Sequence, residues 1–305
     1  MRVVFMGTPS FAVPILEELI SKHEVLMVVS QPDKIVGRKK ILTPTPIHEV
    51  AIRYNIKCHQ PANIKDDYQV ILDLNPDIII TAAYGQMIPS ALLDTPKYKA
   101  INVHASLLPK YRGGAPIHRA IINGDKEAGV SIMYMVKKMD AGDIIMSRSM
   151  EIGDLNTTEL TKELSLLGRD LLMEALENIK NGTINPIKQD EALVSFSYNI
   201  TKEEEHLLFN KKAVEVYNYV RGLNLNPGCY FKHNDKMVKV YKVSYDNQIL
   251  GDVSTVVCDT TKIGIQALDG VIYIEELQLE GKKMMDVKSF LNGMKTYFKK
   301  GDKIE

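Results

Sequence analysis

The segment RVVFMGTPSFAVPILEELISK (residues 2–22) decides the fold of the amino-terminal part of the chain. It begins with a short apolar run that ends at Gly7, and from Pro9 to Lys22 its apolar residues recur at spacings of three and four. This pattern predicts a strand, a turn and a helix. The second and third glycines of the dinucleotide-binding fingerprint are missing after Gly7, so we do not expect NAD to bind.

Further apolar runs repeat this arrangement along the first half of the chain. Three of them have the continuous apolar character of strands buried on both faces of a parallel sheet, namely 24–30, 77–84 and 100–106. Helices are expected near 46–54 and 66–74, two more strands at 129–136 and 143–152, and a long helix from Thr157 to Lys180. The alternation predicts an α/β, Rossmann-like open sheet, with function at the carboxyl ends of its strands.

The pattern of apolar residues changes in the second part of the chain. Residues 186–203 have no clear period, and a helix is expected at about 211–222. Short strand-like runs follow, separated by turn residues, at 228–232, 236–245, 250–257, 261–267 and 270–279. We therefore expect a domain at 1–185, a linker at 186–203 and a small OB-like β-barrel domain at 204–305.

Composition narrows the class of protein. A chain of 305 residues suggests two domains, and a net charge of zero means that any RNA contact must be local rather than spread over a basic surface. The three cysteines lack the spacing of a zinc site, so no metal is expected. No apolar run approaches the roughly 18 residues that span a bilayer. We expect a cytoplasmic protein without a membrane segment.

The segment INVHASLLPKYRGGAPIHRAI (residues 101–120) holds the candidate chemistry. Alternate residues of a strand share a face, so Asn102 and His104 point together toward the strand end. An amide donor beside an imidazole suits acyl transfer, where an oxyanion develops. For the pair alone, a hydrogen-bonded structural histidine is the stronger interpretation.

The neighbouring motifs make the pattern specific. SLLP (106–109), RGGAP (112–116) and MDAGDI (139–144) accompany the Asn-x-His pair, and with it the chain resembles the formyltetrahydrofolate-dependent formyltransferases over nearly its whole length. The resemblance implies that Asn102 donates a hydrogen bond to the oxyanion. It also implies that His104 stabilises this oxyanion and relays a proton, while Asp140 orients and charges the imidazole.

The resemblance also implies a folate co-substrate, 10-formyltetrahydrofolate. Two loops would then surround its pterin ring with apolar walls and few polar groups. Their residues are Ser106, Leu107, Leu108 and Pro109 in one loop, and Ala82, Ala83, Tyr84, Gly85 and Ile88 in the other.

Within the family, four features resemble the members that act on tRNA: FMGTPSFAVPILEEL (5–19), QPDKIVGRKKILTPTP (31–46), AAYG (82–85) and the carboxyl-terminal domain. They imply initiator methionyl-tRNA as the partner, contacted at its acceptor end by Arg38, Lys39 and Lys40 in a long loop. The family's tryptophan-containing turns are absent, because the chain has no tryptophan, and Asn199 replaces a usual linker lysine. These departures concern tRNA docking.

Other functions stay open at this level. The acceptor amine could belong to an amino-sugar nucleotide or to glycinamide ribonucleotide, and a formate-releasing hydrolase would use the same three side chains. A catalytically silent RNA-binding module is a further alternative. We expect a monomer.

Overall fold

A computed structural model describes residues 1–37, 40–258 and 261–305. The chain forms two compact units, each taken by itself below. The first contains Met1–Pro116, Glu127–Glu151 and Thr161–Tyr198, and the second contains Ile117–Lys126, Ile152–Leu160 and Asn199–Glu305.

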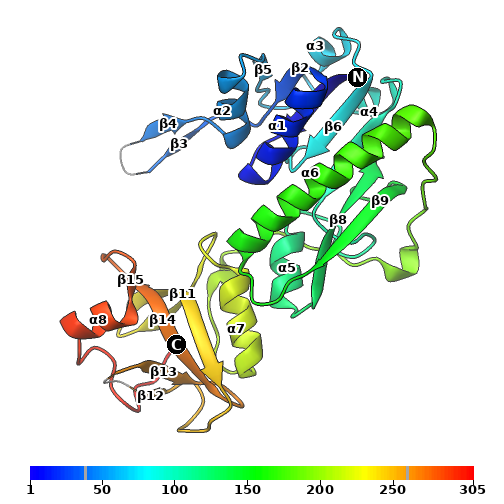
Figure 1. Ribbon diagram of the computed structural model, residues 1–305. Coiled ribbons are helices and arrows are strands. Elements are labelled where there is room, and N and C mark those ends of the chain that lie inside the picture. Colours follow the sequence, from blue (N-terminus) through cyan, green and yellow to red (C-terminus); the bar gives the residue numbers. More distant parts are fainter. Residues whose placement is uncertain (38–39, 259–260) are drawn as a thin grey trace. The chain divides into compact units, whose positions relative to one another are not determined.

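A seven-stranded sheet forms the centre of the first unit (Figure 1). Its order is β5-β2-β1-β6-β7-β8-β9, parallel from β5 to β7 and antiparallel from there to β9. The strands are β1 (Arg2–Gly7), β2 (Glu24–Val29), β5 (Cys58–His59), β6 (Ile78–Ala82), β7 (Ala100–His104), β8 (Glu127–Tyr134) and β9 (Ile144–Glu151). The Rossmann-like α/β prediction is confirmed.

The order of the parallel strands marks where a ligand site belongs. From β1 the chain proceeds to β2 and β5 on one side, and then to β6 and β7 on the other. The direction reverses between β1 and β6, whose last residues Gly7 and Ala82 pair with each other. Open α/β sheets bind ligands at the carboxyl ends of the strands beside such a reversal.

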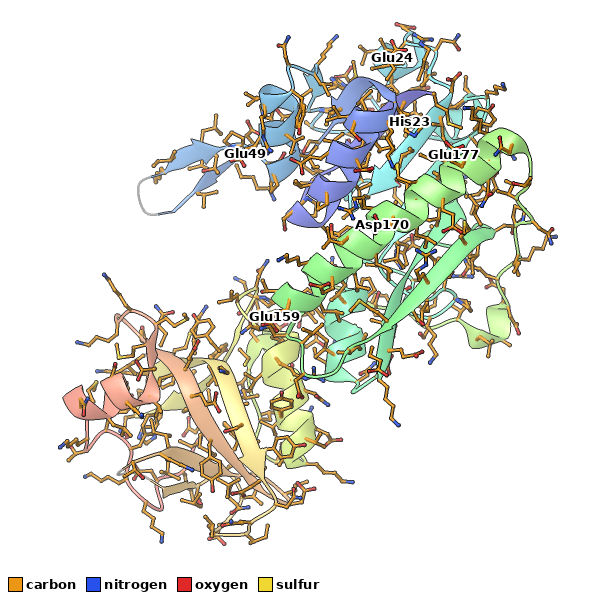
Figure 2. The ribbon with its side chains drawn as sticks, in the orientation of Figure 1. His23, Glu24, Glu49, Glu159, Asp170 and Glu177 are labelled. Carbon is orange, nitrogen blue, oxygen red and sulfur yellow. The ribbon has the colours of Figure 1, made fainter. Side chains whose placement is uncertain are left out.

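Helices of the first unit pack against this sheet. They are α1 (Val13–Lys22), α2 (Pro46–Arg53), α3 (Gln69–Leu72), α4 (Ser90–Asp94) and most of α6 (Thr157–Asn181), whereas α5 (Pro116–Ile122) belongs almost entirely to the second unit. The helix expected at 66–74 is only the single turn α3. On α6, Leu171 and Ala175 are buried, while Asp170 and Glu177 are exposed and labelled in Figure 2.

Gly168 brings α6 close to the strand that carries the candidate chemistry. A Cβ atom at Gly168 would lie 3.0 Å from Cγ1 of Val103 on β7. Val103 therefore faces the helix, and its neighbours Asn102 and His104 lie on the opposite face of the strand.

The segment 31–46 is not the continuous loop that the sequence suggested. Strands β3 (Lys34–Val36) and β4 (Ile41–Thr43) pair antiparallel in a hairpin that projects away from the sheet (Figure 1). β-Branched and apolar residues on both sides of a short connection favour such pairing.

The second unit contains an antiparallel half-barrel sheet in the order β10-β11-β14-β13-β12, with β15 paired to β14. Its strands are β10 (Cys229–His233), β11 (Lys236–Asp246), β12 (Val256–Cys258), β13 (Ile263–Gln266), β14 (Val271–Leu279) and β15 (Met285–Asp286), and its helices include α7 (Ala213–Gly222) and α8 (Val287–Gly293). This agrees with the expected OB-like fold. The strand expected at 250–257 begins only at Val256, and α8 was not expected.

Within the described residues, no helix is both long enough and apolar enough to cross a membrane.

Candidate active site

Asn102 is the first functional side chain on β7. The Thr81 hydroxyl on the adjacent strand β6 donates to Oδ1 of Asn102 at 2.7 Å, and Asn102 is largely buried. Since this bond engages the amide oxygen, the Nδ2 group is left to donate in another direction. The strand pair thus presents an oriented amide donor.

The two ring nitrogens of His104, two residues further along, have different neighbours. Its Nε2 lies 3.0 Å from the carbonyl oxygen of Tyr111. Because a carbonyl oxygen only accepts, the neutral ring carries its proton on Nε2 and its lone pair on Nδ1. Nδ1 faces Oδ2 of Asp140 at 3.8 Å, so a proton taken up there would lie beside a carboxylate.

Asp140 is held from several directions. Its Oδ2 accepts from the Gly113 backbone N–H at 2.8 Å, and its backbone adopts a left-handed φ of 49°. Two residues on, Gly142 is packed so tightly that a Cβ atom would lie 1.8 Å from the Tyr134 carbonyl oxygen. These contacts fix the carboxylate close to the His104 ring.

Arg112 supports the Asp140 turn through Gln189. The sequence analysis did not single it out as a functional residue. Its guanidinium is fully buried and donates through Nε and Nη2 to Oε1 of Gln189 at 3.0 and 2.9 Å. The Gln189 amide donates in turn to the carbonyl oxygens of Asp140 and Gly142, both at 2.8 Å. Arg112 also pairs with the exposed Glu191 at 2.9 Å. Its Nη1 has no partner among the described residues.

The SLLP loop is attached to strand β8. Ser131 on β8 donates to the Ser106 carbonyl oxygen at 2.8 Å and accepts from the Leu108 N–H at 3.1 Å. The Leu107 side chain lies against Gly129, where a Cβ atom would be 2.5 Å from Leu107 Cδ2. Leu107 and Leu108 thus pack into the protein, and Pro109 is half-buried after a cis peptide bond.

The second predicted folate loop follows β6. Ala82 is buried at the strand end, while Ala83 and Gly85 are exposed with left-handed φ values of 50° and 89°. Ile88 is half-buried against the core. Tyr84 is buried, which raises its pKa to about 12, and no described residue bonds to its hydroxyl.

Three polar residues that the sequence analysis missed connect this turn to the neighbouring strands. The Thr8 hydroxyl and the Gln31 amide donate to the Tyr84 carbonyl oxygen at 3.0 and 3.2 Å. Gln86 donates to Gln31 Oε1 at 3.2 Å. Thr8 and Gln31 follow closely on the ends of β1 and β2, so their position after buried strands was a usable signal.

The basic residues at 38–40 are only partly described. Arg38 and Lys39 lie outside the described residues. Lys40 is exposed, with a left-handed φ of 50°, and within the described chain no hydrogen bond or ion pair joins its side chain to Asn102, His104 or Asp140.

The amino-terminal edge of the sheet carries a separate polar depression of about 520 Å³, lined by residues that include Arg2, His23 and Asp77. His23 is labelled in Figure 2. Burial lowers the pKa of His23, assisted by the nearby amino terminus. This edge is opposite to the one that carries His104. No group of acidic, histidine and cysteine residues suited to a metal occurs among the described residues.

Comparison with known proteins identifies the relatives of the chain. The Formyl transferase family matches residues 1–176, and the Formyl transferase, C-terminal domain family matches residues 199–295. A methionyl-tRNA formyltransferase from Ligilactobacillus salivarius is 46% identical over 311 residues, covering 99% of this chain and 98% of that protein. One from Staphylococcus epidermidis is 45% identical, covering 96% of each.

A solved structure shares the fold at low sequence identity. An N-formyltransferase from Helicobacter canadensis, in complex with folinic acid and dTDP-3-aminofucose, has a TM-score of 0.70 at 21% identity. The match covers 90% of this chain and 98% of that one.

Proposed function

The chain belongs to the formyl transferase family, and from this premise we propose that it transfers the formyl group of 10-formyltetrahydrofolate to the amino group of initiator methionyl-tRNA. The observation that carries the chemistry is the contact between His104 on β7 and Asp140, 3.8 Å apart, beside the oriented amide of Asn102. The identity of 45–46% to methionyl-tRNA formyltransferases supports the substrate.

The reaction needs an oxyanion stabiliser and a proton carrier. The methionyl nitrogen attacks the formyl carbon, the carbonyl oxygen becomes an oxyanion, and the bond from that carbon to the folate nitrogen breaks as the folate nitrogen gains a proton. The Nδ2 group of Asn102 donates to the oxyanion. His104 carries the proton from the attacking amine to the leaving nitrogen, and Asp140 stabilises the transient imidazolium.

The folate occupies the carboxyl ends of β1, β6 and β7. The SLLP loop, held on β8 by Ser131, and the turn from Ala82 to Gly85, held by Thr8 and Gln31, form the two sides of its site. Left-handed backbone at Ala83 and Gly85 directs this turn away from the strand. Backbone groups of both loops then provide the few polar contacts that a pterin ring needs.

The tRNA is bound by parts of the chain outside this centre. We assign catalysis to residues 1–185 and tRNA support to residues 204–305, with 186–203 as the linker. Arg38, Lys39 and Lys40, which lie between β3 and β4 in the sequence, contact the acceptor end, where phosphates attract basic side chains.

One specific observation favours a second candidate function. The Helicobacter canadensis relative holds a nucleotide-linked amino sugar, and the same chemistry would formylate such an amine. That protein is only 21% identical to this chain, so formylation of an amino sugar is the weaker hypothesis.

The test is transfer of labelled formyl from 10-formyltetrahydrofolate. The purified protein is offered initiator methionyl-tRNA, elongator methionyl-tRNA, free methionine and a nucleotide amino sugar. We expect formylation of the initiator species alone. Formylation of the amino sugar, or release of free formate, would overturn the substrate assignment.

A further inference from the structure

Two aromatic rings stand exposed on the segment that covers the Arg112 loop. Phe196 and Tyr198 are 53% and 74% exposed, yet their rings stack on each other with centroids 6.0 Å apart and an angle of 16° between planes. Side chains of an extended backbone alternate between its two faces. Ser195 and Ser197 therefore point inward, on the face opposite to the two aromatic residues. Much of the surface of both side chains is therefore exposed to solvent.

This segment is fixed to the protein by backbone hydrogen bonds. Arg112 N–H donates to the Ser195 carbonyl oxygen at 2.9 Å, and Ser197 N–H donates to the Arg112 carbonyl oxygen at 2.7 Å. Gly113 is so close that a Cβ atom there would lie 2.8 Å from the Ser197 carbonyl oxygen. The rings are therefore displayed on an immobilised strand, which reduces the entropy lost when a ligand binds.

The segment also adjoins the candidate catalytic histidine. The Ser197 hydroxyl donates to the Tyr111 carbonyl oxygen at 3.1 Å, and the same oxygen accepts from His104 Nε2 at 3.0 Å. The Tyr111 carbonyl oxygen therefore accepts hydrogen bonds from Ser197 and from the imidazole of His104. Ser197 is the residue between the two aromatics. The segment that carries the rings therefore lies beside the candidate catalytic histidine.

We propose that Phe196 and Tyr198 form a stacking platform for the terminal base at the 3′ end of the tRNA. This inference rests on the proposed function. The reacting amine is joined to the terminal ribose by a short ester linkage, so the terminal base must lie close to His104 when the amine does. Exposed aromatic rings bind bases of single-stranded ends through their faces, without reading sequence.

The experiment measures kcat and KM for methionyl-tRNA with Phe196→Leu and Tyr198→Leu. Each change keeps an apolar side chain and removes the ring. We expect kcat/KM to fall about tenfold for each, which corresponds to about 1.4 kcal/mol, mainly through a higher KM for the tRNA. Tyr198→Phe, which keeps the ring, stays near wild type. Leu193→Ala, at a residue 63% exposed in the same segment, is the matched control and leaves KM unchanged.

A tRNA whose terminal nucleotide lacks its base completes the test. With this substrate we expect wild type and both leucine variants to have equal kcat/KM. A deficit of the variants that persists without the base overturns the platform, as does a rise confined to the KM for 10-formyltetrahydrofolate. Wild-type activity separates the two possible failures. An inactive wild type overturns the proposed function and the platform with it, whereas an active wild type with unaffected variants overturns the platform alone.

Discussion

Replacing Arg112 by methionine is the perturbation whose effect follows most directly from the contacts in the structure. The guanidinium is fully buried and is the main support of Gln189, whose amide holds the Asp140 and Gly142 carbonyl oxygens. Methionine has a similar length and fills the space with apolar atoms. The change therefore removes hydrogen bonds and charge while keeping most of the volume.

The expected loss of unfolding free energy follows from the hydrogen bonds to the side-chain oxygen of Gln189. Arg112→Met removes both hydrogen bonds to Oε1 of the half-buried Gln189, and losing hydrogen bonds to a charged group costs about 1.5–3 kcal/mol. The ion pair with Glu191 adds little, because that carboxylate is exposed to water. We expect the free energy of unfolding to fall by about 2 kcal/mol. As the Asp140 turn loosens, kcat should fall roughly tenfold, since small displacements of catalytic groups are costly.

Urea unfolding, followed by circular dichroism, measures the first effect, and formyl transfer at saturating substrates measures the second. Lys138→Met is the matched control, because Lys138 also pairs with Glu191, at 2.8 Å, but is exposed. Its urea midpoint and kcat should equal those of wild type. An Arg112→Met protein that unfolds at the wild-type midpoint with wild-type kcat would refute the argument that the buried guanidinium supports the Asp140 turn.

Three further changes test other parts of the protein. His104→Ala should lower kcat at least about 100-fold while folate and tRNA dissociation constants stay unchanged; loss of binding in step with activity contradicts its role. Gly142→Ala should destabilise the fold by about 3 kcal/mol or more, because its Cβ would collide with the Tyr134 carbonyl oxygen. Gly293→Ala, which meets no atom within 4 Å, is its control in urea unfolding. Burial lowers the pKa of His118 despite the opposing hydrogen bond from its ring to a backbone carbonyl. The stability that His118 contributes is therefore complete above about pH 6.5 and is lost as pH falls through the lowered folded-state pKa. His118→Gln should flatten the dependence of urea stability between pH 7.5 and 5, and an unchanged slope would count against this.

Local pattern was sufficient for the elements whose burial is periodic. The continuous apolar runs at 2–7, 24–30 and 100–106 predicted β1, β2 and β7, because a strand covered on both faces needs apolar residues at every position. Strand alternation also placed Asn102 and His104 on one face of β7. The change from alternating strands and helices to short strands beyond residue 204 identified the second fold class.

Weaker patterns gave errors for identifiable reasons. Residues 66–74 form only the turn α3, because propensity in a short segment is easily overridden by its surroundings. The β3–β4 hairpin was missed because each strand has three residues, too few to show a period. The helix α8 follows Asp286, which caps it by accepting from Ser289 N–H at 3.0 Å, a signal that was present but not used.

The family resemblance, the order of the motifs along the chain and the residues that share a face of one element could all be inferred from the sequence alone. Tertiary structure alone decided that Gln189 meets Arg112, and that Ser197 shares the Tyr111 carbonyl oxygen with His104. The first pair lies 77 positions apart in the chain. Residues so far apart come together only when the whole unit packs, and neither hydrophobic period nor local propensity records such a contact.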